Sequence, residues 1–202
     1  GCAIARAFTL AGAMAVVLEK GPDILDGASK GNSGILHTGF DAPPGSLEQR
    51  CIAAGYAEYL AIRQRLNLPL LQSGALVLAW TEAEEAALPG LIAQAHENGV
   101  TDVEVLSRDA ILSLEPELSP KVRAGFRVPR EFLIDPWSSP HAYLLQAIEN
   151  GATLQRDCEV TGGGFDGSAW QLETSRGPLT ASFVINAAGL YGDLLDETLL
   201  SQ

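Results

Sequence analysis

Residues 29–39 read SKGNSGILHTG and place three glycines among hydroxyl, ammonium and amide side chains. Glycine accepts a positive φ angle and lets the backbone approach a ligand closely, which suits a loop that surrounds a phosphate group. His37 follows a two-residue apolar step and can transfer a proton beside such a ligand. The stretch therefore predicts a loop that holds a phosphate-bearing cofactor, although turn-forming residues of this kind also make ordinary surface loops.

The residues before this loop have the pattern of the second half of a nucleotide-binding βαβ unit. Residues 1–10 predict a helix, and residues 13–19 predict a short buried parallel strand that ends in a carboxylate. In such a unit the third glycine of the fingerprint opens the helix, and an acid further on binds the ribose. Gly1 and Glu19 match these two places, while an alanine-rich helix beside a strand with a chance glutamate is the alternative. The first strand and two glycines would precede Gly1, so we expect a fragment.

The remaining residues predict a mixed α/β fold. The predicted helices cover residues 47–66, a segment opened by a capping box of Thr81 and Glu84, a short segment capped by Ser107, and residues 139–149. The predicted strands cover residues 74–80, 103–106, 122–128, 132–134 and 153–160, a small meander at 170–174 and 179–180, and a buried strand at 183–189. Three glycines at 162–164 predict a flexible turn.

Composition and charge restrict the classes of function. The 202 residues are 47% hydrophobic and 19% charged, as in an ordinary globular protein, and the formal net charge is -12. This charge argues against nucleic-acid binding and against docking on anionic lipid, so we expect at most peripheral association with a membrane. No apolar run is long enough to span a bilayer. Three separated cysteines without a CxxC pair predict no disulfide framework and no metal site, and they fit a cytoplasmic location.

The order of these pieces resembles the D-amino-acid-oxidase-like superfamily of FAD-dependent oxidoreductases, and within it the FAD-dependent glycerol-3-phosphate dehydrogenases. The motifs that carry the resemblance are SKGNSGILHTG followed by PGSL at 44–47, FLIDPW at 132–137 and VINAAG at 184–189. The resemblance covers nearly the whole chain. It implies a Rossmann-like FAD-binding domain with an inserted mixed-sheet substrate domain. In this division, residues 1–70 and 136–202 belong to the FAD-binding domain, and residues 71–135 belong to the substrate domain.

The resemblance also implies roles for individual residues. Cofactor-binding residues would be Gly1, Glu19, Lys20, Ser29, Asn32, Ser33, Gly34, Val160, Ala188 and Gly189. His37 would lie near the flavin ring as the catalytic acid/base group, and covalent attachment of the flavin at His37 is an alternative use of the same residue. Arg127 and Arg130 are equally available to bind the anion of the substrate.

The implied reaction is oxidation of glycerol-3-phosphate to dihydroxyacetone phosphate by hydride transfer to FAD, with quinone or oxygen as candidate electron acceptors. A second interpretation is oxidation of a 2-hydroxy acid such as L-2-hydroxyglutarate. A third, from a different class, is a truncated, non-catalytic nucleotide-binding module, because the resemblance implies a first strand before Gly1 and a C-terminal segment after Gln202 that would complete the flavin site.

Overall fold

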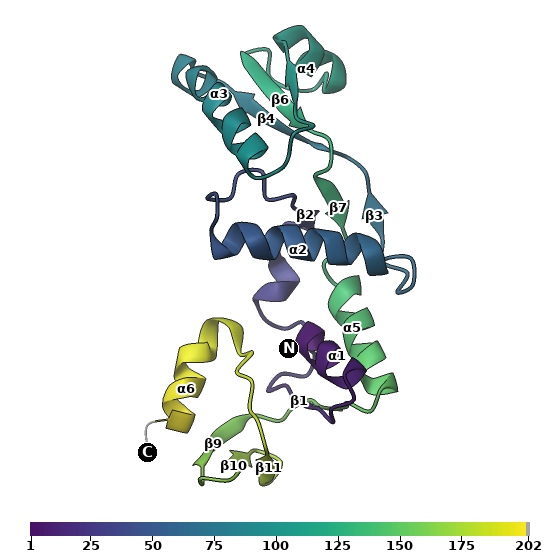
Figure 1. The fold of residues 1–202 in the computed structure, drawn as a ribbon, viewed down its shortest axis with the longest axis vertical. Coiled ribbons are helices and arrows are strands. Elements are labelled where there is room, and N and C mark those ends of the chain that lie inside the picture. The colour runs from purple at the N-terminus through teal and green to yellow at the C-terminus, as the bar shows by residue number, and fades with distance from the viewer. Residues whose placement is uncertain (201–202) are drawn as a thin grey trace. The chain divides into compact units, whose positions relative to one another are not determined.

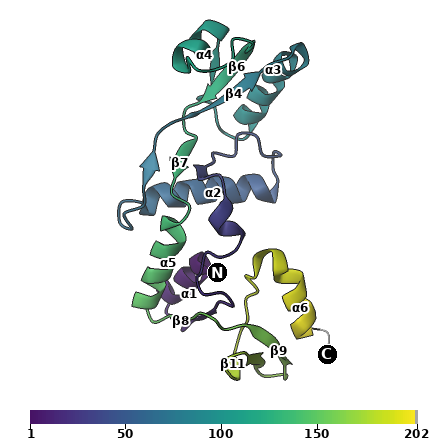
Figure 2. The same ribbon diagram turned by 180° about the vertical axis from the view of Figure 1, so that it is seen from behind.

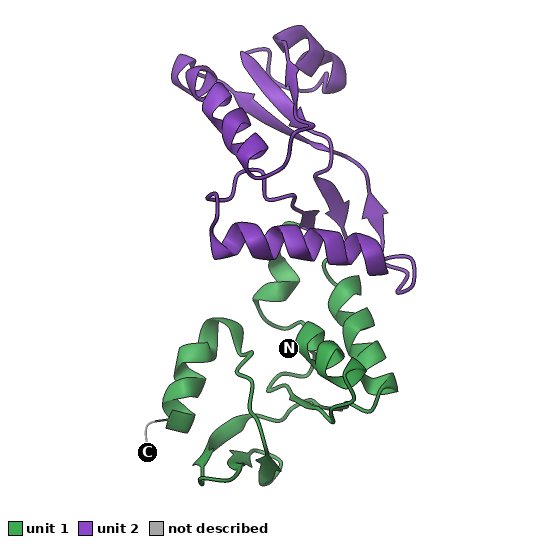
Figure 3. Ribbon diagram, in the orientation of Figure 1, with its two compact units in different colours: residues 1–33, 136–202 green, residues 34–135 purple. Residues whose placement is uncertain are grey.

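The computed structural model describes residues 1–200 and divides the chain into two compact units. Unit 1 combines Gly1–Ser33 with Pro136–Gln202, and unit 2 is Gly34–Asp135 (Figure 3). Residues 34–70 therefore pack with the segment that follows them, and the chain passes from unit 1 to unit 2 inside the glycine-rich loop. The division into functional domains at 70/71 and 135/136 stays a prediction, because compactness does not show which residues bind the cofactor.

Unit 1 is built on two helices and a parallel strand pair. Helix α1 (Cys2–Leu10) lies along α5 (Ser138–Glu149) in both views of the fold (Figures 1 and 2). Strand β1 (Val16–Leu18) pairs in parallel with β8 (Thr153–Gln155). The core holds buried Ala5, Ala147 and Ala152, whose small side chains allow close packing of the two helices on the strands.

The second part of unit 1 is an antiparallel meander in the order β11-β10-β9. Its strands are β9 (Val160–Phe165), β10 (Trp170–Thr174) and β11 (Leu179–Ala181), and the short helix η2 (Gly189–Tyr191) leads into α6 (Gly192–Leu200). The predicted turn at 162–164 is wrong, because these glycines lie inside β9. A Cβ atom on Gly163 would lie 2.3 Å from the carbonyl oxygen of Gln171 on β10, so the close approach of the two strands requires glycine.

Two strand predictions in unit 1 are also wrong. Residues 153–160 are not one strand, because the chain leaves β8 after Gln155 and turns at Asp157, which has a φ angle of 50°. Residues 183–189 form no strand, and Phe183 is 84% exposed. The apolar run that leads into small residues predicted a buried strand, but among residues 1–200 the β1-β8 sheet has only those two members, and the segment pairs with neither of them.

Unit 2 contains a three-stranded antiparallel sheet with a helix on each face. The sheet has the order β4 (Ala75–Ala79), β6 (Ala124–Val128) and β5 (Glu104–Leu106). Helix α3 (Glu82–Glu97) buries Leu88 and Ala95 against Phe126 and Val128. Successive residues of a strand face opposite sides of the sheet, so Gly125 faces away from α3. It lies against Ile111 of α4 (Arg108–Leu114). The capping box of Thr81 and Glu84 at the start of α3 is confirmed.

A second, smaller sheet completes unit 2. It has the order β2 (Ile35–Leu36), β7 (Phe132–Ile134) and β3 (Leu70–Leu71), all antiparallel. Helix α2 (Leu47–Ile62) begins at Ser46, whose side chain accepts a hydrogen bond from the Gln49 amide, and it ends four residues before the predicted end. Buried Tyr59 donates its hydroxyl hydrogen to the Pro69 carbonyl at 2.7 Å, which joins α2 to the start of β3. Across residues 1–200, no helix combines the length and the apolar character needed to cross a membrane.

Candidate functional site

In unit 1, the N-terminus of α1 lies beside the segment that contains Ala188 and Gly189. A Cβ atom placed on Gly1 would lie 3.9 Å from the Cβ of Ala187. Asn186 shapes this segment, because its side-chain oxygen accepts from the Ala188 amide at 3.0 Å and its amide nitrogen donates to the Gly192 carbonyl at 2.6 Å. Small residues thus surround the free amides of a helix N-terminus, an arrangement that can bind the phosphates of a nucleotide.

Glu19 follows the last residue of β1, at the edge where β1 and β8 end. Its Oε1 accepts from the Gly21 amide at 2.7 Å, and its backbone carbonyl accepts from the Cys158 amide at 2.9 Å. These contacts fix the position of a half-buried carboxylate at the end of a parallel strand, where a ribose is bound in dinucleotide folds. Lys20 turns instead to the ring of Tyr191, with Nζ 4.3 Å from the ring centroid. Val160 opens β9, two positions after Cys158.

The glycine-rich loop begins as a single turn of 3-10 helix, η1 (Ala28–Gly31). Asn32 donates from its side chain to the Ser29 carbonyl at 2.8 Å, and the Trp137 indole donates to the Lys30 carbonyl at 3.0 Å. The side chains of Ser29 and Ser33 are exposed. Sequence reasoning missed Trp137 as a residue that orders this loop, and its only signal was its place in the FLIDPW motif.

In unit 2, the register of the small sheet brings His37 to Glu131. Leu36 pairs with Phe132 in an antiparallel register, so His37, which follows Leu36, lies opposite Glu131, which precedes Phe132. Nδ1 of His37 lies 2.9 Å from Oε2 of Glu131, and the side chains are 45% and 2% exposed, respectively. Oε1 of Glu131 accepts from the amide and the hydroxyl of Thr38, both at 2.6 Å. Sequence reasoning missed Glu131, because this residue falls in the connection between the predicted strands at 122–128 and 132–134.

The two candidate arginines are both paired within unit 2, but differently. Arg130 makes two hydrogen bonds to Asp102, at 2.8 and 2.7 Å. This contact lowers the pKa of the Asp102 carboxyl and raises the pKa of the Arg130 guanidinium. Arg127 has a longer contact, with Nη1 3.6 Å from Oε2 of Glu104. The ion pair of Arg127 is therefore looser than that of Arg130.

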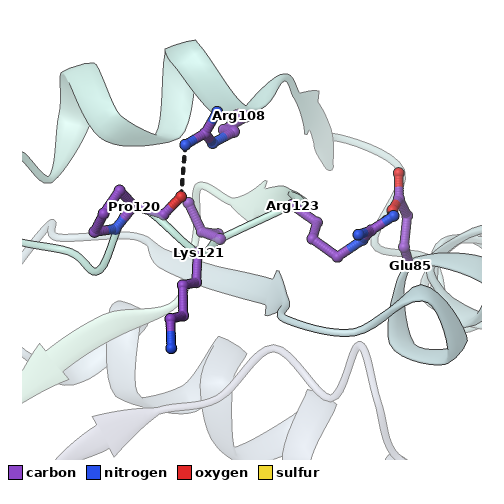
Figure 4. Close-up of a pocket in the computed structure, with 6 residues that line it drawn as sticks. Glu85, Arg108, Pro120, Lys121 and Arg123 are labelled. Atoms are coloured by element: carbon purple, nitrogen blue, oxygen red, sulfur yellow. Dashed lines mark hydrogen bonds and ion pairs between the residues drawn. The ribbon is translucent and has the colours of Figure 1, made fainter.

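A separate basic hollow of unit 2 lies between α3 and α4 (Figure 4). Arg108 donates to the Pro120 carbonyl at 2.6 Å, and Arg123 forms an ion pair with Glu85 at 2.7 Å. The hydrogen bond to Glu85 raises the pKa of Arg123. Because both arginines are already engaged, we assign neither the cofactor nor the substrate to this hollow.

Comparison with known proteins gives one family. The family model described as FAD dependent oxidoreductase, DAO, matches residues 1–202. A glycerol 3-phosphate dehydrogenase of Caloramator mitchellensis is 30% identical over 98% of this chain and 41% of its own length. An L-2-hydroxyglutarate dehydrogenase of Indibacter alkaliphilus is 25% identical over 88% of this chain and 44% of its own length.

A solved structure supports the same fold. The dithionite-reduced L-α-glycerophosphate oxidase of Mycoplasma pneumoniae with FAD bound superposes with a TM-score of 0.88 at 25% identity, over 98% of this chain and 53% of that protein. The expected Rossmann-like α/β fold is thereby confirmed. The chain spans about half the length of the relatives that it matches.

Proposed function

Because the chain belongs to the DAO family of FAD-dependent oxidoreductases, we propose that its protein uses FAD to oxidise glycerol-3-phosphate to dihydroxyacetone phosphate. The observation that carries the proposal is the position of His37. It follows the glycine-rich loop, its side chain is 45% exposed, and its Nε2 has no hydrogen-bond partner among residues 1–200. Similarity to a glycerol 3-phosphate dehydrogenase along nearly the whole chain supports the choice of substrate.

The residues of unit 1 fit the nucleotide half of FAD. A cofactor of this kind needs donors for a pyrophosphate and an acceptor for ribose hydroxyls. The small residues at the start of α1 leave its first amides accessible, and a Cβ on Gly1 would still be 3.9 Å from the nearest atom, Ala187 Cβ. Glu19 presents a carboxylate held by Gly21, and Ser29 and Ser33 present exposed hydroxyls. We propose these residues, with Lys20, Asn32, Gly34, Val160, Ala188 and Gly189, as the FAD-binding set.

The residues of unit 2 fit the chemistry at the substrate. FAD, when bound, supplies the acceptor for a hydride from the carbinol carbon of the substrate. Oxidation of the alcohol to a ketone also releases the hydroxyl proton, and Nε2 of His37 is the group we propose to take it. Arg127 is the cation that we propose for the phosphate, because its existing ion pair is the looser one.

Replacement of His37 tests this role. We expect His37→Gln to lower the anaerobic rate of flavin reduction by glycerol-3-phosphate by about 10²–10⁴-fold, because general base catalysis contributes about that much. The measurement is stopped-flow absorbance of the flavin-loaded protein, and His96→Gln, at the exposed C-terminal end of α3, is the matched control. An unchanged rate in His37→Gln, with flavin still bound, would exclude His37 as the base.

The second candidate substrate is L-2-hydroxyglutarate, favoured by similarity to the Indibacter alkaliphilus dehydrogenase. Glycerol-3-phosphate and L-2-hydroxyglutarate are both hydroxylated anions, so one cation and one base can serve either. Anaerobic bleaching of the flavin by each compound in turn separates them. Failure of the protein to retain FAD would instead favour a non-catalytic module, and flavin that stays with acid-precipitated protein would indicate covalent attachment at His37.

A further inference from the structure

We propose that Glu131 is a positioning residue that holds His37 in the tautomer with hydrogen on Nδ1 and so leaves Nε2 as the base. The inference rests on the proposed function in one respect, which is the use of His37 as a base. The tautomer itself is a property of the side chains in unit 2 and can be measured without catalysis.

The carboxylate of Glu131 is buried and held in one orientation. The Glu131 side chain is 2% exposed, and a buried carboxylate is stable only when its oxygens accept hydrogen bonds. Oε1 accepts twice from Thr38, at 2.6 Å each, which fixes the rotation of the carboxylate. The remaining oxygen, Oε2, therefore points in one direction, and the atom it meets is Nδ1 of His37 at 2.9 Å.

The chemistry of the His37–Glu131 pair decides which imidazole nitrogen carries hydrogen. An ionised carboxylate can only accept a hydrogen bond, so the imidazole nitrogen that faces it must carry hydrogen. A neutral imidazole has one protonated nitrogen, and its other nitrogen then carries a free lone pair. In His37 that nitrogen is Nε2. The neighbouring cation does not compete for Glu131, because the Arg130 guanidinium is engaged with Asp102.

Further hydrogen bonds restrain the segments that carry both partners of the pair. Tyr56 donates its hydroxyl hydrogen to the Arg130 carbonyl at 3.0 Å, next to Glu131 in the chain. Asn98 donates from its side chain to the Gly39 carbonyl at 2.9 Å, two residues after His37. These bonds restrict both segments, so the His37–Glu131 geometry is formed before any substrate binds.

The test is Glu131→Gln, read by ¹⁵N NMR of histidine-labelled 202-residue chain at a pH well above the ordinary imidazole pKa. The chain has three histidines, and His96→Gln and His141→Gln assign the spectrum by loss of signals. The glutamine oxygen can still accept from Thr38, whereas its NH₂ group donates toward Nδ1. We expect the wild type to show hydrogen on Nδ1 and Glu131→Gln to show hydrogen on Nε2.

Glu85→Gln is the matched control. It makes the same substitution at a carboxylate of unit 2 that pairs with Arg123 instead, so the wild-type tautomer of His37 is expected to persist. In flavin-loaded protein, we expect Glu131→Gln to lower the rate of flavin reduction by about 10²–10⁴-fold without weakening substrate binding, and Glu85→Gln to change the rate less than tenfold.

The outcomes separate this inference from the proposed function. Hydrogen on Nδ1 in Glu131→Gln would overturn the positioning role whatever the enzyme does. A switched tautomer with an unchanged rate of flavin reduction would overturn the role of His37 as base and, with it, the catalytic value of the pair. If Glu131→Gln does not fold, the wild-type spectrum decides, because hydrogen on Nε2 in the wild type contradicts the inference.

Discussion

At the scale of single residues, the ion pairs of unit 2 separate two arginines that the sequence left equivalent. Arg130 is bound by both oxygens of Asp102, and Tyr56 fixes its carbonyl. Arg127 has one contact of 3.6 Å to Glu104. A guanidinium bound by two short hydrogen bonds stabilises a structure, whereas a loosely paired one can bind a ligand at smaller cost.

Asp102→Asn tests the structural role of the Arg130 pair. Arg130 lowers the pKa of Asp102 below its usual 3.8, so the pair stabilises the fold above the usual carboxyl pKa, and the stabilisation disappears as pH falls through the lowered value. Both side chains are about 40% exposed, so we expect a loss of only about 0.5 kcal/mol at neutral pH. Urea unfolding at neutral and strongly acidic pH measures this loss of unfolding free energy. Glu104→Gln, which removes the ion-pair partner of Arg127, is the control. An equal loss at both pH values would contradict the ionic origin.

At the scale of elements, helix caps formed by residues close in the sequence were predicted correctly, whereas pairing between distant strands was not. The caps at Thr81 and Ser107 were predicted because a cap is formed by residues three positions apart, and both are present. Residues 183–189 were wrongly predicted as a strand because a strand also needs a partner. Glu131 was missed for a related reason. Its bonds to Thr38 join residues 93 positions apart, and only the pairing of β2 with β7 brings them together.

The cap of α3 gives a prediction at this scale. Thr81 accepts from the Glu84 amide at 3.2 Å, and Glu84 accepts in return from the Thr81 and Trp80 amides. The bonds from these amides lower the pKa of Glu84. We expect Thr81→Ala to lower the free energy of unfolding by about 1 kcal/mol, since it leaves a helix amide without its acceptor. Urea denaturation measures the loss, and Thr101→Ala, at an exposed position outside the helices, should change stability much less. Equal effects of the two substitutions would contradict the cap.

At the scale of the whole molecule, the chain is two compact units whose first boundary lies inside the loop that carried the sequence argument. The loop was predicted as one functional segment, and its residues up to Ser33 belong to unit 1 while Gly34 and His37 belong to unit 2. Apart from Gly34, the proposed cofactor-binding residues therefore lie in unit 1, and the proposed base His37 lies in unit 2. Each unit has its own buried core. The core of unit 2 centres on Phe126, and that of the β9-β10-β11 sheet contains Leu172.

Because each unit has its own core, we expect a cavity in one core to destabilise mainly the unit that contains it. Phe126 is fully buried, so we expect Phe126→Ala to cost about 3–5 kcal/mol, with increased amide exchange confined mainly to residues 34–135. Leu172→Ala, in β10, should increase exchange mainly in residues 1–33 and 136–200 and cost about 2–5 kcal/mol. Hydrogen exchange with mass spectrometry on the whole chain resolves the two regions, and each variant is the control for the other. Equal loss of protection in both regions from either substitution would mean that the two units unfold as one cooperative body. Only in a shared unfolding transition does a cavity in one core lower the stability of the other unit.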